Sequence, residues 1–395
     1  MHVNKRNFEF NPWCEISMIS CTDLFRIFQK NGLTFFTGIP DSTFKGWMSF
    51  LERENGRILT QITVANECEA VAIAMGYYLS TKKVAVVYMQ NSGLGKTVNP
   101  ITSLCDPEVY SIPMILMIGW RGEPGKKDEP QHKKMGRIMI NLLETMEIPY
   151  ELLPESSKEG EKVITTMKNI AIKQNTPVAL IIRRGVIEEN SGEEKSHTDR
   201  EFEMTREEAI KIIVDSLDET EVVVSTTGKT SRELFEYRIE RNEIPHDFYT
   251  VGGMGCAASI ALSIAIQKPE KKIFVFDGDG AIIMQMGSLA TIGHYRPSNF
   301  YHILFDNQVH DSTGGQKTLS ETINFEKVAL ACGYNNAITV RTKTDLKRAI
   351  RSMKKLRGPQ MLIVKIKRGS RKNLGRPTTT PIENKKKFMK TLERN

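Results

Sequence analysis

The chain has 395 residues, of which 40% are hydrophobic and 26% charged, and its formal net charge at pH 7 is +8. This length allows two or three domains with separate cores, and the balance of apolar and charged residues excludes an intrinsically disordered or fibrous protein. No apolar run approaches the roughly 20 residues of a membrane span and no signal peptide is visible, so we expect a cytoplasmic protein. The six cysteines form no CxxC pair, so we expect them to be reduced and mostly buried.

The excess positive charge lies mainly near the C-terminus, from Lys365 onward, among polar residues and prolines rather than aromatic side chains. A nucleic-acid-binding surface needs stacking aromatics on a basic face, so this pattern favours a solvated basic tail. A basic surface would also help to recruit a polyanionic substrate.

The first half of the chain alternates predicted strands with predicted helices. It opens with an amphipathic helix over Met18–Lys30. We expect strands at Thr34–Phe36, Ile58–Val64, Val84–Tyr88, Met114–Ile118 and Val178–Ile182. Such alternation predicts a parallel sheet with helices on both faces.

Residues 188–204 are charged and lack hydrophobic periodicity, which is typical of a linker. A second half opens with a helix at Thr205 and repeats the alternation. We expect a strand at Glu221–Ser225, a helix at Ala257–Ile266, strands at Ile273–Phe276 and Tyr301–Phe305 with a helix at Ala281–Thr291 between them, and a closing strand at Met361–Ile366. The sequence therefore predicts an α/β protein of two doubly wound parallel-sheet domains, residues 1–187 with an N-terminal extension and residues 205–395 with the basic tail.

The most informative motif, Asp277-Gly278-Asp279-Gly280, directly follows one of these strands. Open α/β sheets bind ligands at the carboxyl ends of their strands. The glycines let backbone approach a phosphate, the helix that follows can face an anion, and Asp279 is a hard oxygen ligand suited to Mg²⁺. Asn307 follows the next strand at the same edge, which favours a site for a diphosphate and a cation over a simple strand turn with a helix-capping acid.

This arrangement resembles the GDG…N signature of thiamine-diphosphate-dependent enzymes. In that family the Asp, the Asn and the carbonyl two residues after it hold the metal, which implies Asp279, Asn307 and the backbone oxygen of Val309 as Mg²⁺ ligands. The resemblance implies two domains of the thiamine-diphosphate-binding fold, a pyrimidine domain followed by a diphosphate domain. It also implies that the diphosphate is contacted by Gly278, Gly280 and Ala281.

A second candidate phosphate loop, Ser225–Ser231, follows a strand and precedes a helix, so Thr227 and Gly228 could cradle the diphosphate. Its pattern is weak by itself. In Tyr249–Ala257, Met254 occupies the position of the large apolar side chain over which the family bends its cofactor, and Gly252 would offer its carbonyl to the cofactor's amine. The competing interpretation, a nucleotide-binding glycine turn, lacks the G-x-G-x-x-G order.

The family also needs a glutamate that hydrogen-bonds the pyrimidine ring. Glu67 stands where a predicted strand gives way to a helix, and Gly76-Tyr77 follow it nine and ten residues later, as in the family's strand-Glu-helix element. The neighbouring Glu69 competes as an acid that only stabilises a helix N-terminus.

Four stretches resemble phosphonopyruvate decarboxylases within this family: Gly38–Gly46, Met89–His132, His310–Thr318 and Leu374–Lys385. The resemblance implies a carboxy-lyase that converts 3-phosphonopyruvate to phosphonoacetaldehyde and CO₂ through a thiamine-diphosphate adduct, a step in phosphonate biosynthesis such as that of 2-aminoethylphosphonate. It further implies a homo-oligomer whose active site lies at a subunit interface. The alternative is a sulfopyruvate decarboxylase or another thiamine-diphosphate-dependent 2-oxo acid decarboxylase.

Within these stretches, polar residues become candidates for the substrate site. Arg121 is the first candidate for the phosphonate because a guanidinium can bind it bidentately, although it could equally close a surface turn. His310 and Asp311 could carry the proton to the intermediate, or stiffen the metal loop as a structural pair. Further candidates for substrate contact or loop ordering are Asp41, Ser42, Asn91 and Ser92.

Other classes fit less well. A carboligase with a third, middle domain finds no room in the 188–204 linker, and a non-catalytic binding module would be expected to lack Glu67 or a metal ligand. Asp306 departs from relatives that commonly carry a second Asn there, and we expect little effect because Asn307 is the ligating position.

Overall fold

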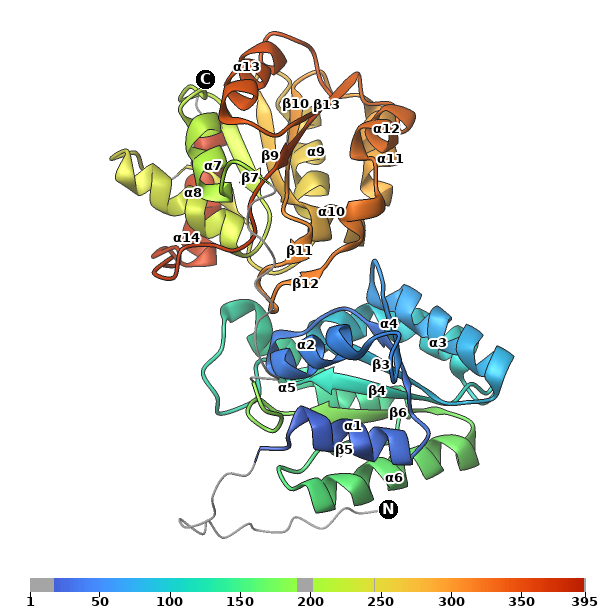
Figure 1. Cartoon of the computed structure of the whole chain (residues 1–395). Helices are drawn as coiled ribbons and strands as arrows, with labels where there is room; N and C mark the ends of the chain where they lie inside the picture. The colour runs from blue at the N-terminus through green and yellow to red at the C-terminus, as the bar shows by residue number, and fades with distance from the viewer. Residues whose placement is uncertain (1–17, 190–201, 245, 394–395) are drawn as a thin grey trace.

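The computed structural model describes residues 18–189, 202–244 and 246–393. These residues form two halves, each built on a six-stranded parallel sheet with helices on both faces (Figure 1). The N-terminal extension before Met18 and residues 190–201 of the predicted linker lie outside the described residues.

The first sheet has the strand order β2-β1-β3-β4-β6-β5, and all its pairs are parallel. Its strands are β1 Phe35–Gly38, β2 Thr60–Thr63, β3 Ala85–Gln90, β4 Met114–Gly119, β5 Tyr150–Leu152 and β6 Pro177–Ile182. Its helices are α1 Cys21–Lys30, α2 Lys45–Glu54, α3 Glu67–Thr81, α4 Leu94–Pro100, α5 Pro130–Thr145 and α6 Ser157–Gln174, with short helical turns η1 Ser42–Phe44, η2 Asn91–Gly93 and η3 Ile101–Cys105.

The second sheet has the order β13-β14-β10-β9-β7-β8, again all parallel. Its strands are β7 Val222–Ser225, β8 Phe248–Tyr249, β9 Ile273–Gly278, β10 Phe300–Asp306, β13 Asn336–Val340 and β14 Gln360–Lys365, with a small hairpin of β11 Val309–His310 and β12 Gln316–Lys317. Its helices are α7 Arg206–Val214, α8 Lys229–Glu240, α9 Ala257–Gln267, α10 Asp279–Met284, α11 Gly287–Tyr295, α12 Phe325–Ala331, α13 Lys343–Met353 and α14 Pro381–Glu393, with the turn η4 Leu319–Thr322.

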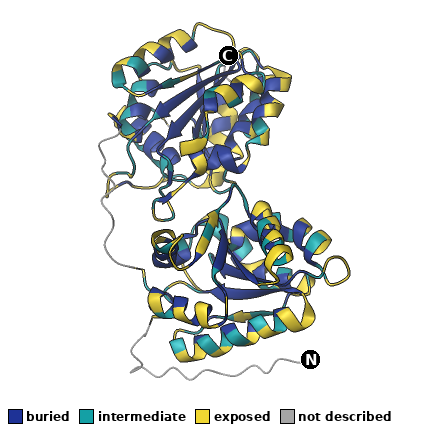
Figure 2. Cartoon of the chain, turned by 45° about the vertical axis from the view of Figure 1, so that its right-hand side comes forward, coloured by how far each residue is buried: buried dark blue, intermediate teal, exposed yellow. Residues whose placement is uncertain are grey.

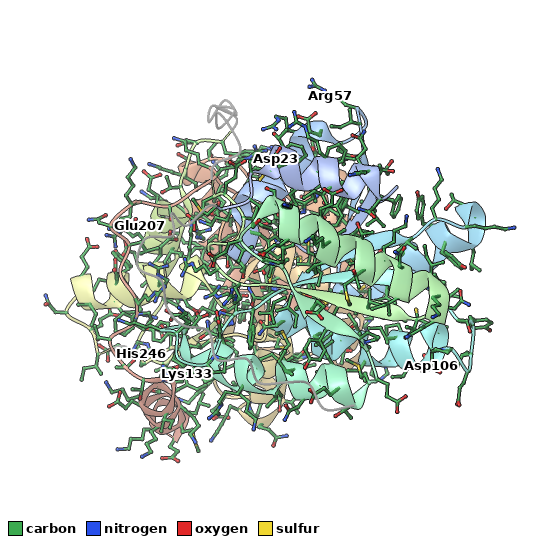
Figure 3. The ribbon with its side chains drawn as sticks, turned by 90° about the horizontal axis from the view of Figure 1, so that it is seen from below. Asp23, Arg57, Asp106, Lys133, Glu207 and His246 are labelled. Carbon is green, nitrogen blue, oxygen red and sulfur yellow. The ribbon has the colours of Figure 1, made fainter. Side chains whose placement is uncertain are left out.

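Each sheet buries side chains on both faces, because the alternating residues of its apolar strands meet helices on either side. The central strands are buried and the outer faces of the helices are exposed (Figure 2). Charged side chains away from these cores point to solvent, as does Arg57 in the turn before β2 at the rim of the first half (Figure 3). The predicted fold class, two doubly wound parallel-sheet domains, is thereby confirmed.

Some predicted elements differ from the structure. The predicted helix Ala281–Thr291 is two helices, α10 and α11, because Gln285 leaves the helical conformation (φ −132°, ψ 41°) and lets α11 pack beside α9. Three strands of the two six-stranded sheets, β5, β8 and β13, were not predicted, and neither was the β11–β12 hairpin. They are short or carry polar residues.

The C-terminal basic segment is not simply a solvated tail, because its last part forms α14 and packs on the second half. Phe388 is buried and lies against Phe248, with ring centroids 5.3 Å apart. Asn384 is also buried, donates to the Asp247 carbonyl at 2.8 Å and accepts from Tyr249 N at 3.2 Å. Two polar bonds and an aromatic contact therefore fix a helix whose lysines face outward.

The expectation of mostly buried cysteines was wrong for the described part of the chain. Cys21 and Cys105 are buried, Cys332 is intermediate, and Cys68 and Cys256 are exposed; all five are free. Among the described helices, none is both long and apolar enough to cross a membrane.

The two halves meet at the edges where their strands end. In Figure 1, α10 and the β11–β12 hairpin lie on the side of the second half that faces α2, α4 and α5 of the first. Met254 and Met284 pack against the core of the first sheet, and Arg376 forms an ion pair with Glu129 at the start of α5. Both edges that the sequence marks as ligand sites thus face one another.

Candidate active site

Asp279 is the first residue of α10, at the carboxyl end of β9, and only 3% of it is exposed. One of its carboxylate oxygens accepts a hydrogen bond from the Thr318 hydroxyl. Burial and the nearby Asp306 carboxylate raise the pKa of Asp279 to about 8. A buried carboxylate that resists ionisation in the protein alone suits a cation, whose charge would reverse both effects.

Asn307 lies just beyond β10, and Asp311 fixes the orientation of its amide. The amide nitrogen of Asn307 donates to Asp311 at 2.8 Å, and its oxygen accepts from Val309 N at 3.2 Å. The Val309 carbonyl accepts from Asp311 N at 3.1 Å. The amide oxygen of Asn307 and the Val309 carbonyl each keep a lone pair for a metal.

Asp311 is held by three partners and is therefore committed to structure. It accepts from Arg206 at 3.0 Å, from Asn307, and from Gly369 N at 3.0 Å. Arg206 is itself buried and makes a bidentate pair with Glu233, at 2.8 and 3.1 Å. The carboxylate of Asp311 orients the metal loop, and the structure gives it no hydrogen bond to His310.

His310 lies where Gly280 of the GDG motif leaves space. A Cβ atom on Gly280 would come within 2.8 Å of the His310 ring and 3.3 Å of the Met254 methyl group, so only glycine fits between them. Desolvation of its ring lowers the pKa of His310 to about 4. The structure thus brings together His310, Met254 and the GDG turn.

The loop after β8 has a backbone that requires glycine. Gly252, Gly253 and Gly255 have φ angles of 76°, 55° and 86°, a region that other residues rarely adopt. Gly252 N donates to the Thr227 hydroxyl at 3.1 Å, which ties this loop to the one after β7. Both predicted cofactor loops of the second sheet are therefore in contact.

Glu67 begins α3, just after β2, and only 5% of it is exposed. One carboxylate oxygen, Oε2, has no hydrogen-bond partner among the described residues, although the Lys96 ammonium lies 3.5 Å away. A Cβ atom on Gly93 would lie 2.3 Å from the other oxygen, so η2 needs glycine there. Glu69, by contrast, accepts from Ala65 N and serves the helix N-terminus, as the competing interpretation proposed for that residue.

Arg121 lies beyond β4, and other side chains already hold its guanidinium. It binds Asp128 bidentately, at 2.8 and 2.5 Å, and donates to the Ser42 hydroxyl at 2.8 Å. Its backbone is held as well, because Asn91 donates to the Arg121 carbonyl at 2.7 Å and accepts from its N–H at 3.3 Å. Three of the five guanidinium N–H groups are used, and two remain for a ligand.

Asp41 and Ser92 are linked through Gln90. The Ser92 hydroxyl donates to Gln90 at 2.7 Å, and Gln90 donates to Asp41 at 2.9 Å. The second oxygen of Asp41 is buried without a partner among the described residues and lies where a Cβ on Gly119 would clash. All five predicted substrate residues thus meet at the ends of β1, β3 and β4.

Sequence reasoning missed several residues of these edges. Thr318 lies within a stretch that the sequence already marked, 39 residues after the Asp279 that it contacts. Lys96 lies within the Met89–His132 stretch but carried no separate signal. Asp128 and Gln90 also escaped notice, because only the folded loop brings them to Arg121 and Asp41.

The residues present fit thiamine diphosphate and a divalent cation. Glu67 Oε2 is a buried acceptor without a hydrogen bond, as a site for a pyrimidine ring requires, and glycine at position 280 keeps open the space beside Met254. Among the described residues no three His, Cys, Asp or Glu side chains gather as a metal site. The predicted ligand set needs one carboxylate only, with an amide and a backbone oxygen, which is a donor set that Mg²⁺ accepts.

Family models agree with this geometry. The N-terminal TPP (thiamine pyrophosphate, that is, thiamine diphosphate) binding domain of thiamine pyrophosphate enzymes matches residues 21–140, and the C-terminal TPP binding domain matches residues 226–364. The fold and the site thus define a thiamine-diphosphate-dependent enzyme.

Curated relatives narrow this class. The chain is 35% identical over 389 residues to phosphonopyruvate decarboxylase of Streptomyces viridochromogenes, covering 94% of both chains. It is 34% identical over 384 residues to that of Streptomyces hygroscopicus, covering 94% of this chain and 93% of the relative. Sulfopyruvate decarboxylase of Methanosarcina acetivorans is 27% identical over 391 residues, 93% of this chain and 96% of the relative. The chain belongs to the phosphonopyruvate decarboxylase family, as its sequence stretches predicted.

Proposed function

We propose that this protein decarboxylates 3-phosphonopyruvate to phosphonoacetaldehyde and CO₂, with thiamine diphosphate and Mg²⁺ as cofactors. The observation that carries the proposal is the similarity to two phosphonopyruvate decarboxylases over almost the whole chain, against 27% identity to a sulfopyruvate decarboxylase. The product keeps its carbon–phosphorus bond, which is consistent with a step in phosphonate biosynthesis.

The second sheet would hold the metal and the diphosphate. Asp279, Asn307 and the Val309 carbonyl supply oxygen ligands for Mg²⁺, and the loops after β7 and β9 approach the diphosphate through their glycines. Bound thiamine diphosphate supplies the electron sink that the carboxylate of a 2-oxo acid lacks. Asp311 and Arg206 keep the metal loop in place.

The first sheet would supply the pyrimidine partner and the substrate contacts. Glu67 would offer the oxygen that has no hydrogen bond among the described residues to the pyrimidine ring, and its burial would keep water away from that hydrogen bond. The two remaining N–H groups of Arg121 would bind the anionic substrate as a charge-assisted pair of donors. His310, beside Met254, is placed to move a proton at a ring nitrogen.

Decarboxylation assays test the proposal directly. Purified protein with thiamine diphosphate and Mg²⁺ should release CO₂ from 3-phosphonopyruvate in preference to sulfopyruvate and pyruvate. The Glu67→Gln variant should lose this activity. Preference for sulfopyruvate or pyruvate would move the protein to another decarboxylase, and no release from any of the three would refute the proposal.

We also propose that the protein is a homo-oligomer, on the evidence of α3. This helix is apolar on nearly all sides, yet Cys68, Ala72 and Leu79 are exposed along one face, Leu79 to 63%. A helix that is apolar all round is normally buried. A second copy of the chain is the partner that would cover this face, and light scattering should give a multiple of 44.8 kDa.

A mixing experiment tests whether two chains share each active site. Glu67→Gln and Asp279→Asn each damage a different edge. If one chain supplies Glu67 and another Asp279, mixed oligomers of the two inactive variants regain activity at the sites that carry neither change. If both edges come from one chain, every site in the mixture stays damaged and no activity returns.

A further inference from the structure

Lys229 lies at the diphosphate edge but has no assigned role. It is the first residue of α8 and follows Gly228, whose φ of 97° turns the chain at the carboxyl end of β7. Because β7 pairs with β9 in the sheet, this loop lies next to the GDG turn. Lys229 therefore stands at the edge that the family uses for a phosphorylated ligand.

Among the described residues, the ammonium of Lys229 differs from the other cations of this edge in having no partner. Within the described part of the chain it forms no hydrogen bond and no ion pair, although it is half-buried. Arg206 binds Glu233 and Asp311, Lys365 pairs with Asp306, and Arg232 donates to the carbonyls of Leu374 and Gly375.

Burial without a partner is costly for a charged group. Desolvation lowers the pKa of Lys229, and the charges of Asp311 and Glu233 only oppose this effect from a distance beyond ion pairing. A ligand oxygen that bears negative charge would offset the free energy that the ammonium loses when it is desolvated. A neutral ligand would offset much less of this cost.

A second unpartnered group lies at the next strand. Thr250 follows β8, and its N–H donates to the Ser225 carbonyl at 3.2 Å, which places it beside the end of β7. Its hydroxyl is buried and has no partner among the described residues, and only 8% of the residue is exposed. Within the described ranges, two polar groups on adjacent strand ends are thus left without partners.

We infer that the Lys229 ammonium binds an anionic oxygen on phosphorus of a bound ligand at the edge formed by β7, β8 and β9. This inference rests on the proposed function and adds one residue to the proposed ligand contacts. Two ligands of the reaction carry such oxygens, the diphosphate of the cofactor and the phosphonate of the substrate. A single variant can tell them apart because the two ligands are measured separately.

The test uses the full chain with Lys229→Met, which keeps the length of the side chain and removes its charge, and Lys229→Arg, which keeps the charge. Lys347→Met is the matched control, since Lys347 is an exposed lysine of α13, far from the β11–β12 hairpin in Figure 1. Titration calorimetry with thiamine diphosphate and Mg²⁺ gives the Kd of the cofactor. Steady-state rates at saturating cofactor give KM for 3-phosphonopyruvate.

A contact with the cofactor should raise the Kd of thiamine diphosphate about ten- to a hundredfold in Lys229→Met, because bonds to charged groups are the strong ones. A contact with the substrate should instead raise KM by a similar factor and leave the Kd unchanged. In either case Lys229→Arg should recover most of the loss, and Lys347→Met should match the parent.

Both constants within twofold of the parent in a folded Lys229→Met variant would overturn the inference. Circular dichroism checks the fold, and Lys229→Gln replaces the methionine variant if that one does not fold. A parent protein that binds thiamine diphosphate but decarboxylates nothing would refute the proposed function alone, because the cofactor measurement still decides the role of Lys229.

Discussion

The two edges that face each other in this protein differ in how their polar side chains are bonded. At the first edge, most polar side chains are bonded to one another: Arg121 to Asp128 and Ser42, Asn91 to the backbone of Arg121, and Ser92 through Gln90 to Asp41. At the second edge, three carboxylates, Asp279, Asp306 and Asp311, gather around the end of β10.

This difference means that the first edge is preorganised for a ligand, whereas the second edge needs a cation to complete it. The first edge can keep its geometry without a ligand, because most of its donors and acceptors already satisfy each other. One oxygen each of Asp41 and Glu67 has no hydrogen bond among the described residues. The second edge places three carboxyl groups in a poorly hydrated position. Lys365 pairs with Asp306 and Arg206 with Asp311, whereas no cation of the described residues pairs with Asp279. A cation at Asp279 would complete it, so only the second edge should depend on metal.

Of the substitutions that test this difference, Asp279→Asn should have the largest effect on cofactor binding and CO₂ release. Loss of outer-shell partners costs metal sites about 10- to 100-fold in affinity, and loss of a ligand should cost more. We expect thiamine diphosphate binding in the presence of Mg²⁺ to weaken at least about a hundredfold, and CO₂ release with it. Calorimetry and a CO₂ assay measure both.

Removal of the metal is the companion experiment. EDTA should reproduce this loss in the parent protein, Mg²⁺ should reverse it, and Asp279→Asn should gain nothing from added Mg²⁺. Cofactor binding that is equally tight with and without EDTA would remove the distinction between the two edges.

Arg121→Lys should give the second largest effect, at the first edge. Lysine cannot reproduce the bidentate bond to Asp128, and the 14% exposed side chain of Asp128 would lose part of its pairing. We expect KM for 3-phosphonopyruvate to rise about tenfold, the value of one strong charge-assisted bond, and the melting temperature to fall by roughly 2 to 8 °C.

Asp128→Asn separates these two consequences. It removes the same ion pair but leaves the guanidinium, so it should lower the melting temperature by a similar amount and change KM less. If Arg121→Lys alters stability alone, Arg121 is a structural residue of the loop and the phosphonate binds elsewhere.

The positions of these edges were predictable, but their bonding was not. Strand ends of a parallel sheet share an edge, so an apolar run followed by Asp279, Asn307 or Glu67 places each of these residues from sequence alone. The pairing of Arg121 with Asp128, or of Asp279 with Thr318, depends on how loops close in three dimensions. Spacing along the chain carries no signal for such contacts.

Elements without a strong hydrophobic pattern could not be predicted from the sequence either. β13 alternates buried and exposed residues irregularly, and β5 has three residues, so neither stands out from a loop. The C-terminal helix α14 was not predicted, because its lysines made the segment look like a solvated basic tail. Its attachment depends on Asn384 and Phe388, two residues whose partners lie more than 130 positions earlier.

Asp41→Asn should give the smallest effect, one visible only as a dependence on pH. Burial raises the pKa of Asp41 above its ordinary value of 3.8, while bonds from Gln90 and Thr43 and the charge of Arg121 oppose the shift. Because the folded state then holds this proton more tightly than the unfolded chain, its contribution to stability is complete below about pH 4 and is lost as pH rises through the raised pKa.

Asparagine cannot ionise, so the variant escapes this loss. The melting temperatures of both proteins are measured from pH 4 to pH 8, with saturating Mg²⁺ to keep the second edge constant. As pH rises, the melting temperature of the variant should increase relative to that of the parent. Ser42→Ala is the control, because it changes the same turn without a titrating group and should keep a constant offset. A constant offset for Asp41→Asn as well would mean that Asp41 keeps one protonation state throughout, and that the first edge is fully neutralised by its own hydrogen bonds.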